Sequence, residues 1–108
     1  MTKVIIEPGI CNFTTVVTAQ VDEDDEQTVT LNVSSGCPSV KAMMEALGDT
    51  FDSFEVCLVK PGKGPFFEYA SEKFPIHVGC PVICGISKCA EAECGLALKK
   101  DASIKFAD

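Results

Sequence analysis

Apolar and polar residues alternate over the first third of the chain. In the stretches 13–21 and 28–33, mostly apolar side chains occupy every second position, and a short acidic segment separates the two stretches. A period of two is typical of strands with one buried face, so these stretches predict an antiparallel hairpin covered on one side. The short apolar run 4–6 stops at Pro8 and predicts an edge strand. A last alternation, at 103–106, predicts a final strand.

Two further stretches repeat their apolar residues with the period of an α-helix. The first begins after Cys37-Pro38, because proline suits the first helical turn, and Gly48 is a typical stop. The second covers 66–74, with Phe67, Ala70 and Phe74 predicted to face inward. Residues 51–59 fit either a strand or a short capped helix, and the pattern leaves both open.

The stretch 77–98 holds the only histidine and four of the seven cysteines. Pro81 opens a third predicted helix, whose apolar stripe includes Cys89. Gly95 marks its end, or a weak point before it continues to Leu98. We therefore expect a single α+β domain spanning 1–108, in which a small antiparallel sheet, formed by the hairpin and the terminal strands, has one face covered by about three helices.

Composition narrows the class of function. The chain has 108 residues, 46% of them hydrophobic, which is typical of one folded core. Its net charge of −7 argues against binding to nucleic acid or to anionic membranes, which need basic patches. No apolar run approaches the ~20 residues that cross a bilayer, and the N-terminal segment lacks the pattern of a secretion signal. We therefore expect a cytoplasmic protein, in which cysteines serve metal or redox chemistry more often than disulfides.

Four cysteines and the histidine are candidates for a shared site. Cys37 and Cys80 each precede a predicted helix, and the free N–H groups at a helix start favour a thiolate. His77 lies three residues before Cys80, and Cys84 lies one helical turn after it, which places one nitrogen and two sulfurs near one helix end. Cys11 follows the turn after the first strand, where a partly buried thiol and a ligand are equally compatible with the pattern.

The other cysteines have simpler interpretations. Cys89 is predicted to pack as a small hydrophobic residue, and Cys94 is compatible with packing or with a ligand role. The side that Cys57 faces depends on whether its stretch is a strand or a helix. The acidic run 22–26 lacks the spacing of a calcium-binding loop and predicts a solvated hairpin tip. No nucleophile motif or phosphate-binding loop is present, so no catalytic residue is predicted.

Three motifs extend over most of the chain: Pro-Gly-Ile-Cys-Asn-Phe at 8–13, the cysteine before the first helix, and His-x-x-Cys-Pro-Val at 77–82, followed by Cys-Gly-Ile-x-Lys and Gly-Leu-Ala-Leu-x-Lys-Asp. They resemble a family of small cysteine-containing prokaryotic domains that has no assigned activity. The resemblance implies that Cys11, Cys37, Cys80 and His77 are the common site. It also implies that Cys84, Cys89 and Cys94 are additions in this chain.

Three functions are compatible with this pattern. The first is a metal- or iron–sulfur-binding module, in which Cys11, Cys37 and Cys80 bind zinc or a cluster and His77 or Cys84 is the fourth ligand. The second is a thiol redox or sulfur-handling protein, in which Cys80 is the reactive thiolate and Cys37 or Cys84 is the resolving cysteine. The third is a structural domain, or one that binds a protein partner, whose thiols only pack. The sequence has no Cys-x-x-Cys pair, so the first function requires the fold to bring distant cysteines together.

Overall fold

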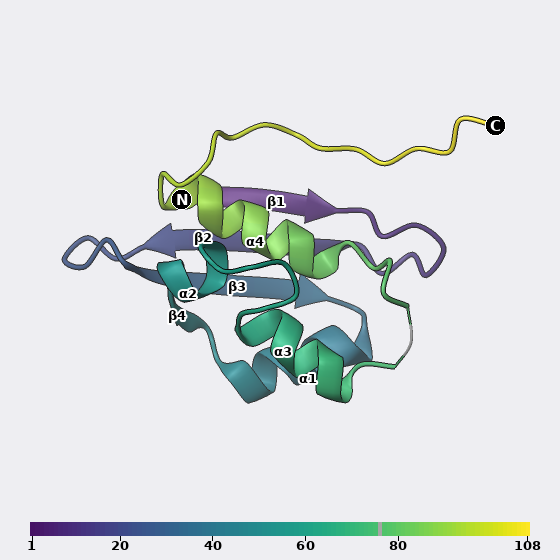
Figure 1. The fold of residues 1–108 in the computed structure, drawn as a ribbon, viewed down its shortest axis with the longest axis horizontal. Coiled ribbons are helices and arrows are strands. Elements are labelled where there is room, and N and C mark those ends of the chain that lie inside the picture. The colour runs from purple at the N-terminus through teal and green to yellow at the C-terminus, as the bar shows by residue number, and fades with distance from the viewer. Residues whose placement is uncertain (76) are drawn as a thin grey trace.

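The computed structural model is an α+β domain, and it describes residues 1–75 and 77–108 (Figure 1). Within these residues, four antiparallel strands form one sheet in the order β1-β2-β3-β4, and four helices accompany it. The strands are β1 (Thr2–Ile6), β2 (Thr15–Val21), β3 (Thr28–Ser35) and β4 (Thr50–Asp52). The helices are α1 (Pro38–Leu47), α2 (Ser53–Cys57), α3 (Pro65–Lys73) and α4 (Val82–Glu93). The predicted fold class is confirmed.

The β2–β3 hairpin follows the alternating pattern of the sequence. Val17 pairs with Val33, and Ala19 pairs with Leu31, on the face that the helices cover. On the opposite face Thr18 pairs with Asn32, which is exposed to solvent. The sheet is therefore covered on one side, as predicted, and the apolar residues of the hairpin form the floor of the core.

Helix α4 supplies the main cover for this floor. It lies against β1 and β2, and its buried residues are Val82, Ile83, Gly85, Ile86, Cys89 and Ala90. Gly85 permits the close approach, because a Cβ atom at this position would overlap the Cγ1 and Cδ1 atoms of Ile6 at the end of β1. The helix ends at Glu93, two residues before Gly95, which has a φ of 73°. Of the two ends that the sequence left open, the structure has the earlier one.

The side chain of Glu93 attaches the other end of α4 to the sheet. Its Oε1 atom accepts a hydrogen bond of 2.7 Å from the Thr2 hydroxyl, and its Oε2 atom accepts one of 3.0 Å from the Val21 N–H. The Met1 ammonium lies 3.6 Å from Oε1. Burial acts to raise the pKa of Glu93, but these hydrogen bonds and the ammonium outweigh it and lower the pKa. The carboxylate thus joins the last turn of α4 to the start of β1 and the end of β2.

The stretch that the sequence left open contains both of its predicted elements. Strand β4 ends at Asp52, and α2 begins at the next residue without a connecting loop. The Oδ1 atom of Asp52 accepts a hydrogen bond of 2.9 Å from the Phe54 N–H, which caps the helix. In α3, Phe66 is the fully buried aromatic residue and packs on Phe51 at 4.8 Å between ring centroids, while Phe67 is only half-buried. The inward face of α3 therefore includes Phe66, which the sequence analysis missed.

The predicted final strand at 103–106 is wrong for the single chain. Residues 98–108 have no regular secondary structure and are exposed along their whole length. The edges of the sheet are β1 and β4 instead. None of the helices in the described ranges is long and apolar enough to span a membrane.

We expect the substitution Gly85→Ala to destabilise the protein. Alanine favours a helix by about 1 kcal/mol over glycine, but overpacking a core costs about 1–3 kcal/mol, so the free energy of unfolding should fall. Urea denaturation measures this change. In the double variant with Ile6→Ala the overlap is removed. The double variant should therefore lose less free energy of unfolding than the sum of the losses in the two single variants. Gly79→Ala is the control, since no neighbouring atom lies within 4 Å of its Cβ position.

We expect Glu93→Gln to lower the free energy of unfolding by about 1–3 kcal/mol at neutral pH. The glutamine NH₂ group is a donor, and it would face either the Thr2 hydroxyl or the Val21 N–H, which are donors too. The lowered pKa of Glu93 gives this contribution a defined pH dependence. It is present above the unfolded pKa, near 4.5, and is lost as pH falls through the lower folded pKa. Denaturation at several pH values should show the two proteins converging in acid. A difference that stayed constant down to acid pH would contradict the assignment.

Candidate functional site

Three cysteine-bearing segments leave the sheet at the same end. Ile6 pairs with Thr15, and Thr15 pairs with Ser35, so the β1–β2 loop and the segment after β3 are neighbours. Helix α4 also begins at this end, because Gly85, near its start, lies against Ile6. Figure 1 shows these segments together on the right of the molecule. We call this the cysteine end, and it carries Cys11, Cys37, His77, Cys80 and Cys84.

Two turns at the cysteine end hold residues in unusual backbone conformations. In the first, the Asn12 N–H donates to the Gly9 carbonyl at 3.0 Å, and Asn12 has a φ of 58°. In the second, the Cys80 N–H donates to the His77 carbonyl at 3.2 Å, and His77 has a φ of 97°. Within the described part of the chain, no other non-glycine residue has a positive φ. Asparagine adopts this conformation readily, but histidine does so rarely, and strained residues cluster at functional sites. Asn12 adjoins Cys11, and His77 is itself a candidate ligand.

Cys37 is held more firmly than the loop cysteines. It is the N-cap residue of α1 and is half-buried against the core. Its N–H donates to the Ser35 hydroxyl at 3.1 Å, and that hydroxyl accepts a further hydrogen bond of 2.8 Å from Thr15. The start of α1 is thus fixed to the end of the hairpin, whereas Cys11 and Cys80 lie in exposed loops.

The structure divides the seven cysteines into two groups. Cys11, Cys80 and Cys84 are exposed and, with half-buried Cys37, lie at the cysteine end. The other three are Cys57, Cys89 and Cys94; like Cys37 they lie in the core or against it, but none of them lies in the segments of the cysteine end. No disulfide joins any of the seven.

The second group has the properties of packed thiols. Burial, with a smaller effect from Glu91, raises the pKa of Cys57 to about 12. Burial, with a smaller effect from Glu93, raises the pKa of Cys89 to about 11, and burial also raises the pKa of Cys94. The Cys89 thiol donates to the carbonyl oxygens of Thr2 at 3.3 Å and Val17 at 3.6 Å. The predicted packing role of Cys89 is confirmed.

The first group does not form a ready-made metal site. In residues 1–75 and 77–108, no three histidine, cysteine, aspartate or glutamate side chains are placed so that they could hold one metal ion. The fold therefore brings the predicted segments to one end without assembling their side chains. The predicted ligand set, Cys11, Cys37 and Cys80 with His77 or Cys84, stays a prediction.

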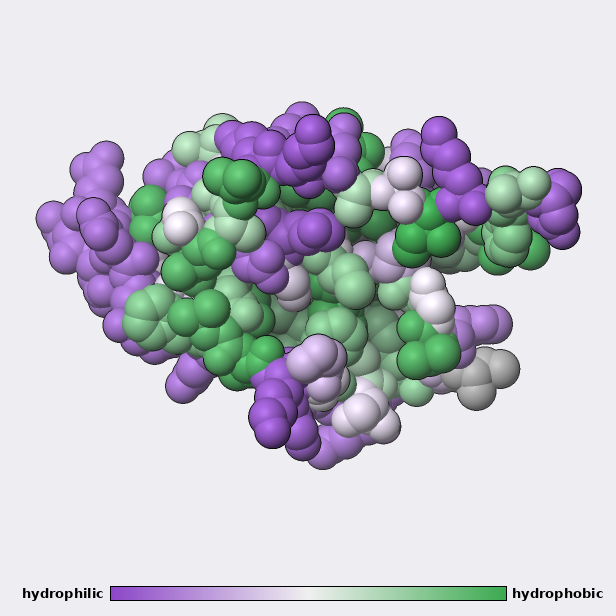
Figure 2. All heavy atoms as spheres, turned by 45° about the horizontal axis from the view of Figure 1, so that its top comes forward, coloured by the Kyte–Doolittle hydropathy of each residue, from purple (hydrophilic) through white to green (hydrophobic). Residues whose placement is uncertain are grey.

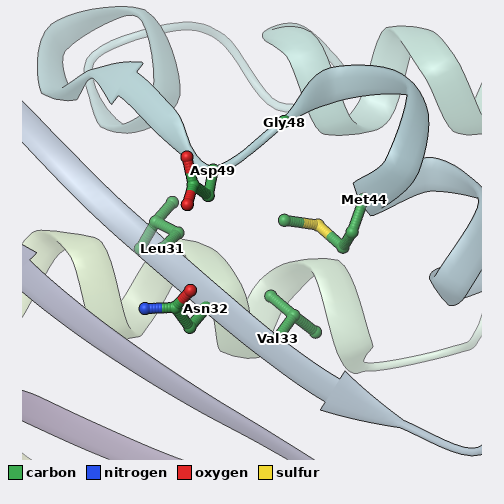
Figure 3. A pocket seen from close by; sticks show the side chains of 6 residues that line it. All are labelled: Leu31, Asn32, Val33, Met44, Gly48 and Asp49. Atoms are coloured by element: carbon green, nitrogen blue, oxygen red, sulfur yellow. The ribbon is translucent and has the colours of Figure 1, made fainter.

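Two hollows lie on the surface, and the second includes Cys84 of the cysteine end. The first, of about 310 Å³, lies between β3 and α1, and Figure 3 shows the Met44 side chain extending from α1 toward the strand. It contains no cysteine, and Asp49 is its only ionisable lining residue. The second, of about 260 Å³, lies between α2, α3, α4 and the connector 58–64.

The second hollow combines features that the sequence analysis did not connect. Its lining includes apolar Phe67, the exposed thiol of Cys84, and three lysines, Lys60, Lys63 and Lys88. The connector lysines alone predicted only solvation, and no local signal places Lys88 of α4 beside them. Figure 2 shows apolar side chains gathered at the left of the molecule, and α2 lies at the left in Figure 1. Phe54 of α2 is exposed.

Comparison with protein families shows which family the chain belongs to. The sequence profile of a family of unknown function, DUF6951, matches residues 2–106. The chain belongs to this family. The DUF6951 match covers every strand and helix as well as most of the exposed C-terminal segment, and it confirms the resemblance to a family without an assigned activity. Neither a comparison with curated proteins nor one with solved structures gave a match.

We expect alkylation by iodoacetamide at about pH 8 to separate the two groups of cysteines, because only the thiolate reacts. Exposed Cys11, Cys80 and Cys84 should react first, whereas Cys57 and Cys89, with pKa values of about 12 and 11, should stay protonated and shielded. Mass mapping of peptides from timed reactions measures the order. Unfolding in urea should remove the difference. Equal rates for Cys80 and Cys89 in the folded protein would contradict it.

Proposed function

We propose that this domain binds zinc or an iron–sulfur cluster through the thiols of the cysteine end. One observation carries the proposal. Cysteine is among the residue types most often fully buried, so a cysteine that only packs should lie in the core. Cys89 is buried, and Cys37, Cys57 and Cys94 pack half-buried against the core, but Cys11, Cys80 and Cys84 are exposed. These three share one end of the sheet with Cys37. Packing does not account for the three exposed positions, whereas a ligand role does.

The chemistry of the donors supports the same proposal. Cys11, Cys37 and Cys80 supply three thiolates from three separate segments, and His77 or Cys84 supplies the fourth donor. Three or four thiolates, with or without one imidazole, suit zinc or a cluster better than hard cations such as magnesium or calcium. Cys37 is fixed at the start of a helix, so the loops that carry Cys11 and Cys80 would move toward it on binding.

The surroundings of the loops support this movement. Ile10, next to Cys11, and Val78, two residues before Cys80, are both fully exposed. Removal of large apolar side chains from water lowers the free energy of the protein. Closure of the two loops around a bound centre would bury Ile10 and Val78 and so favour the closed form. Metal binding should therefore order the loops and stabilise the folded state.

A thiol redox function uses the same end of the molecule. It is favoured by the exposure of both Cys80 and Cys84, which lie on either side of the start of α4. In this function Cys80 and Cys84 lose two electrons and two protons to form a disulfide, and a low-molecular-weight disulfide gains them and leaves as two thiols. Metal-free protein that forms this bond rapidly and selectively would favour the redox function over the metal-binding one.

Purification without oxygen, followed by elemental analysis and absorption spectroscopy, tests the metal proposal. We expect stoichiometric zinc, or iron with the charge-transfer bands of a cluster, and loss of the metal in Cys37→Ala and Cys80→Ala. Cys94→Ala is the matched control, because Cys94 follows the far end of α4 and should leave the metal content unchanged. Separate His77→Ala and Cys84→Ala variants identify the fourth ligand. Absence of both metals, or an equal loss in the Cys94 variant, would refute the proposal.

A further inference from the structure

The C-terminal tail, residues 98–108, belongs to the family region but is not packed in the single chain. The DUF6951 match continues to residue 106, twelve residues beyond the C-cap of α4 at Cys94. All residues of the tail are exposed, and Figure 1 shows it extending past α4 as a separate trace. A segment that the family profile includes, yet that lies outside the core of its own chain, points to a partner outside that chain.

The tail has the pattern of a strand with one apolar face. Ile104 and Phe106 alternate with Ser103 and Lys105, and in the single chain they are 93% and 99% exposed. An isolated strand is not stable in water, because its backbone groups and its apolar face both need a neighbour. This pattern therefore fits a segment that becomes a strand when it meets the edge of a sheet.

Strand β1 offers such an edge. It is the outer strand of the sheet and pairs only with β2 among the described residues, so one side of its backbone is open along Thr2–Ile6. Val4, in the middle of β1, faces the core but is only half-buried. The opposite edge strand, β4, has three residues and is too short to be an equal template.

We propose that the C-terminal tail of one copy of this chain adds to β1 of a second copy as a further strand, so that Ile104 and Phe106 pack beside Val4. Charge favours a second copy as the occupant. The last ten positions hold Lys99, Lys100 and Lys105 against Asp101 and Asp108, a formal charge of +1, so the rest of the chain, whose total is −7, carries −8. A weakly basic tail is attracted to the acidic body of another copy. Reciprocal exchange about a two-fold axis uses both tails and both open edges of the dimer.

Sedimentation of the full chain over a range of concentrations tests the proposal. A chelator and a reductant are present, so that neither a shared metal nor a disulfide can hold two copies together. We expect a dimer, and we expect Ile104→Ser with Phe106→Ser to raise its Kd at least about tenfold, because both apolar anchors are lost. Ser103→Ala with Lys105→Arg, which changes the alternate positions of the same segment, is the matched control and should leave the Kd nearly unchanged.

Hydrogen exchange of the β1 amides provides a second measurement. In the dimer these amides should be protected, and in the Ile104→Ser, Phe106→Ser variant they should exchange faster while the circular dichroism of the fold stays the same. A full chain that is monomeric at all concentrations would overturn the proposal. So would a variant that dimerises as tightly as the unchanged chain, or protection of β1 by the tail within a monomer.

Discussion

The close contact between α4 and β1 determines how the rest of the molecule is arranged. At one end of the helix, Gly85 lets the backbone approach Ile6, and at the other end Glu93 bonds to Thr2 and Val21. A helix fixed at two points along a strand has only one direction. The start of α4 must therefore lie where β1 ends, which brings the segment of His77 and Cys80 to the same end as Cys11 and Cys37. The cysteine end is a consequence of this packing, and its thiols share an end because the helix has no freedom to turn.

The same contact explains why the cysteines of α4 differ in character. Cys89 lies on the helix face that covers the sheet, where its thiol finds two carbonyl oxygens and little space. Cys84 lies more than one turn earlier on a different face and is exposed. Burial opposes ionisation of Cys89, whereas Cys84 is accessible to a ligand or reagent because it is exposed. The number of cysteines alone is therefore a poor guide to chemistry in this chain, because helix phase separates thiols that can bind a ligand from thiols that fill the core.

Some elements could be predicted from local patterns, and others could not. The alternation in 28–33 predicts β3, and Cys37-Pro38 with Gly48 predicts α1, because each signal describes one element by itself. Residues 51–59 gave two answers because Asp52 ends a strand and caps a helix at once. At 103–106 the alternation is genuine, but a pattern describes the faces of a strand and says nothing about whether a neighbour is present. For the site, spacing and helix starts indicated the segments. The exposure of each thiol depends on turns, such as that of His77, whose backbone angles no composition rule supplies.

The order of the elements along the chain has a consequence for synthesis of the protein. Each strand of the sheet pairs with its neighbour in sequence, so β1, β2 and β3 are complete within the first 35 residues. Their cover, α4, comes from residues 82–93, and only then can Glu93 reach Thr2. A nascent chain therefore carries an uncovered apolar sheet while most of the remaining sequence is translated, and it depends on the last helix to shield that surface from other chains.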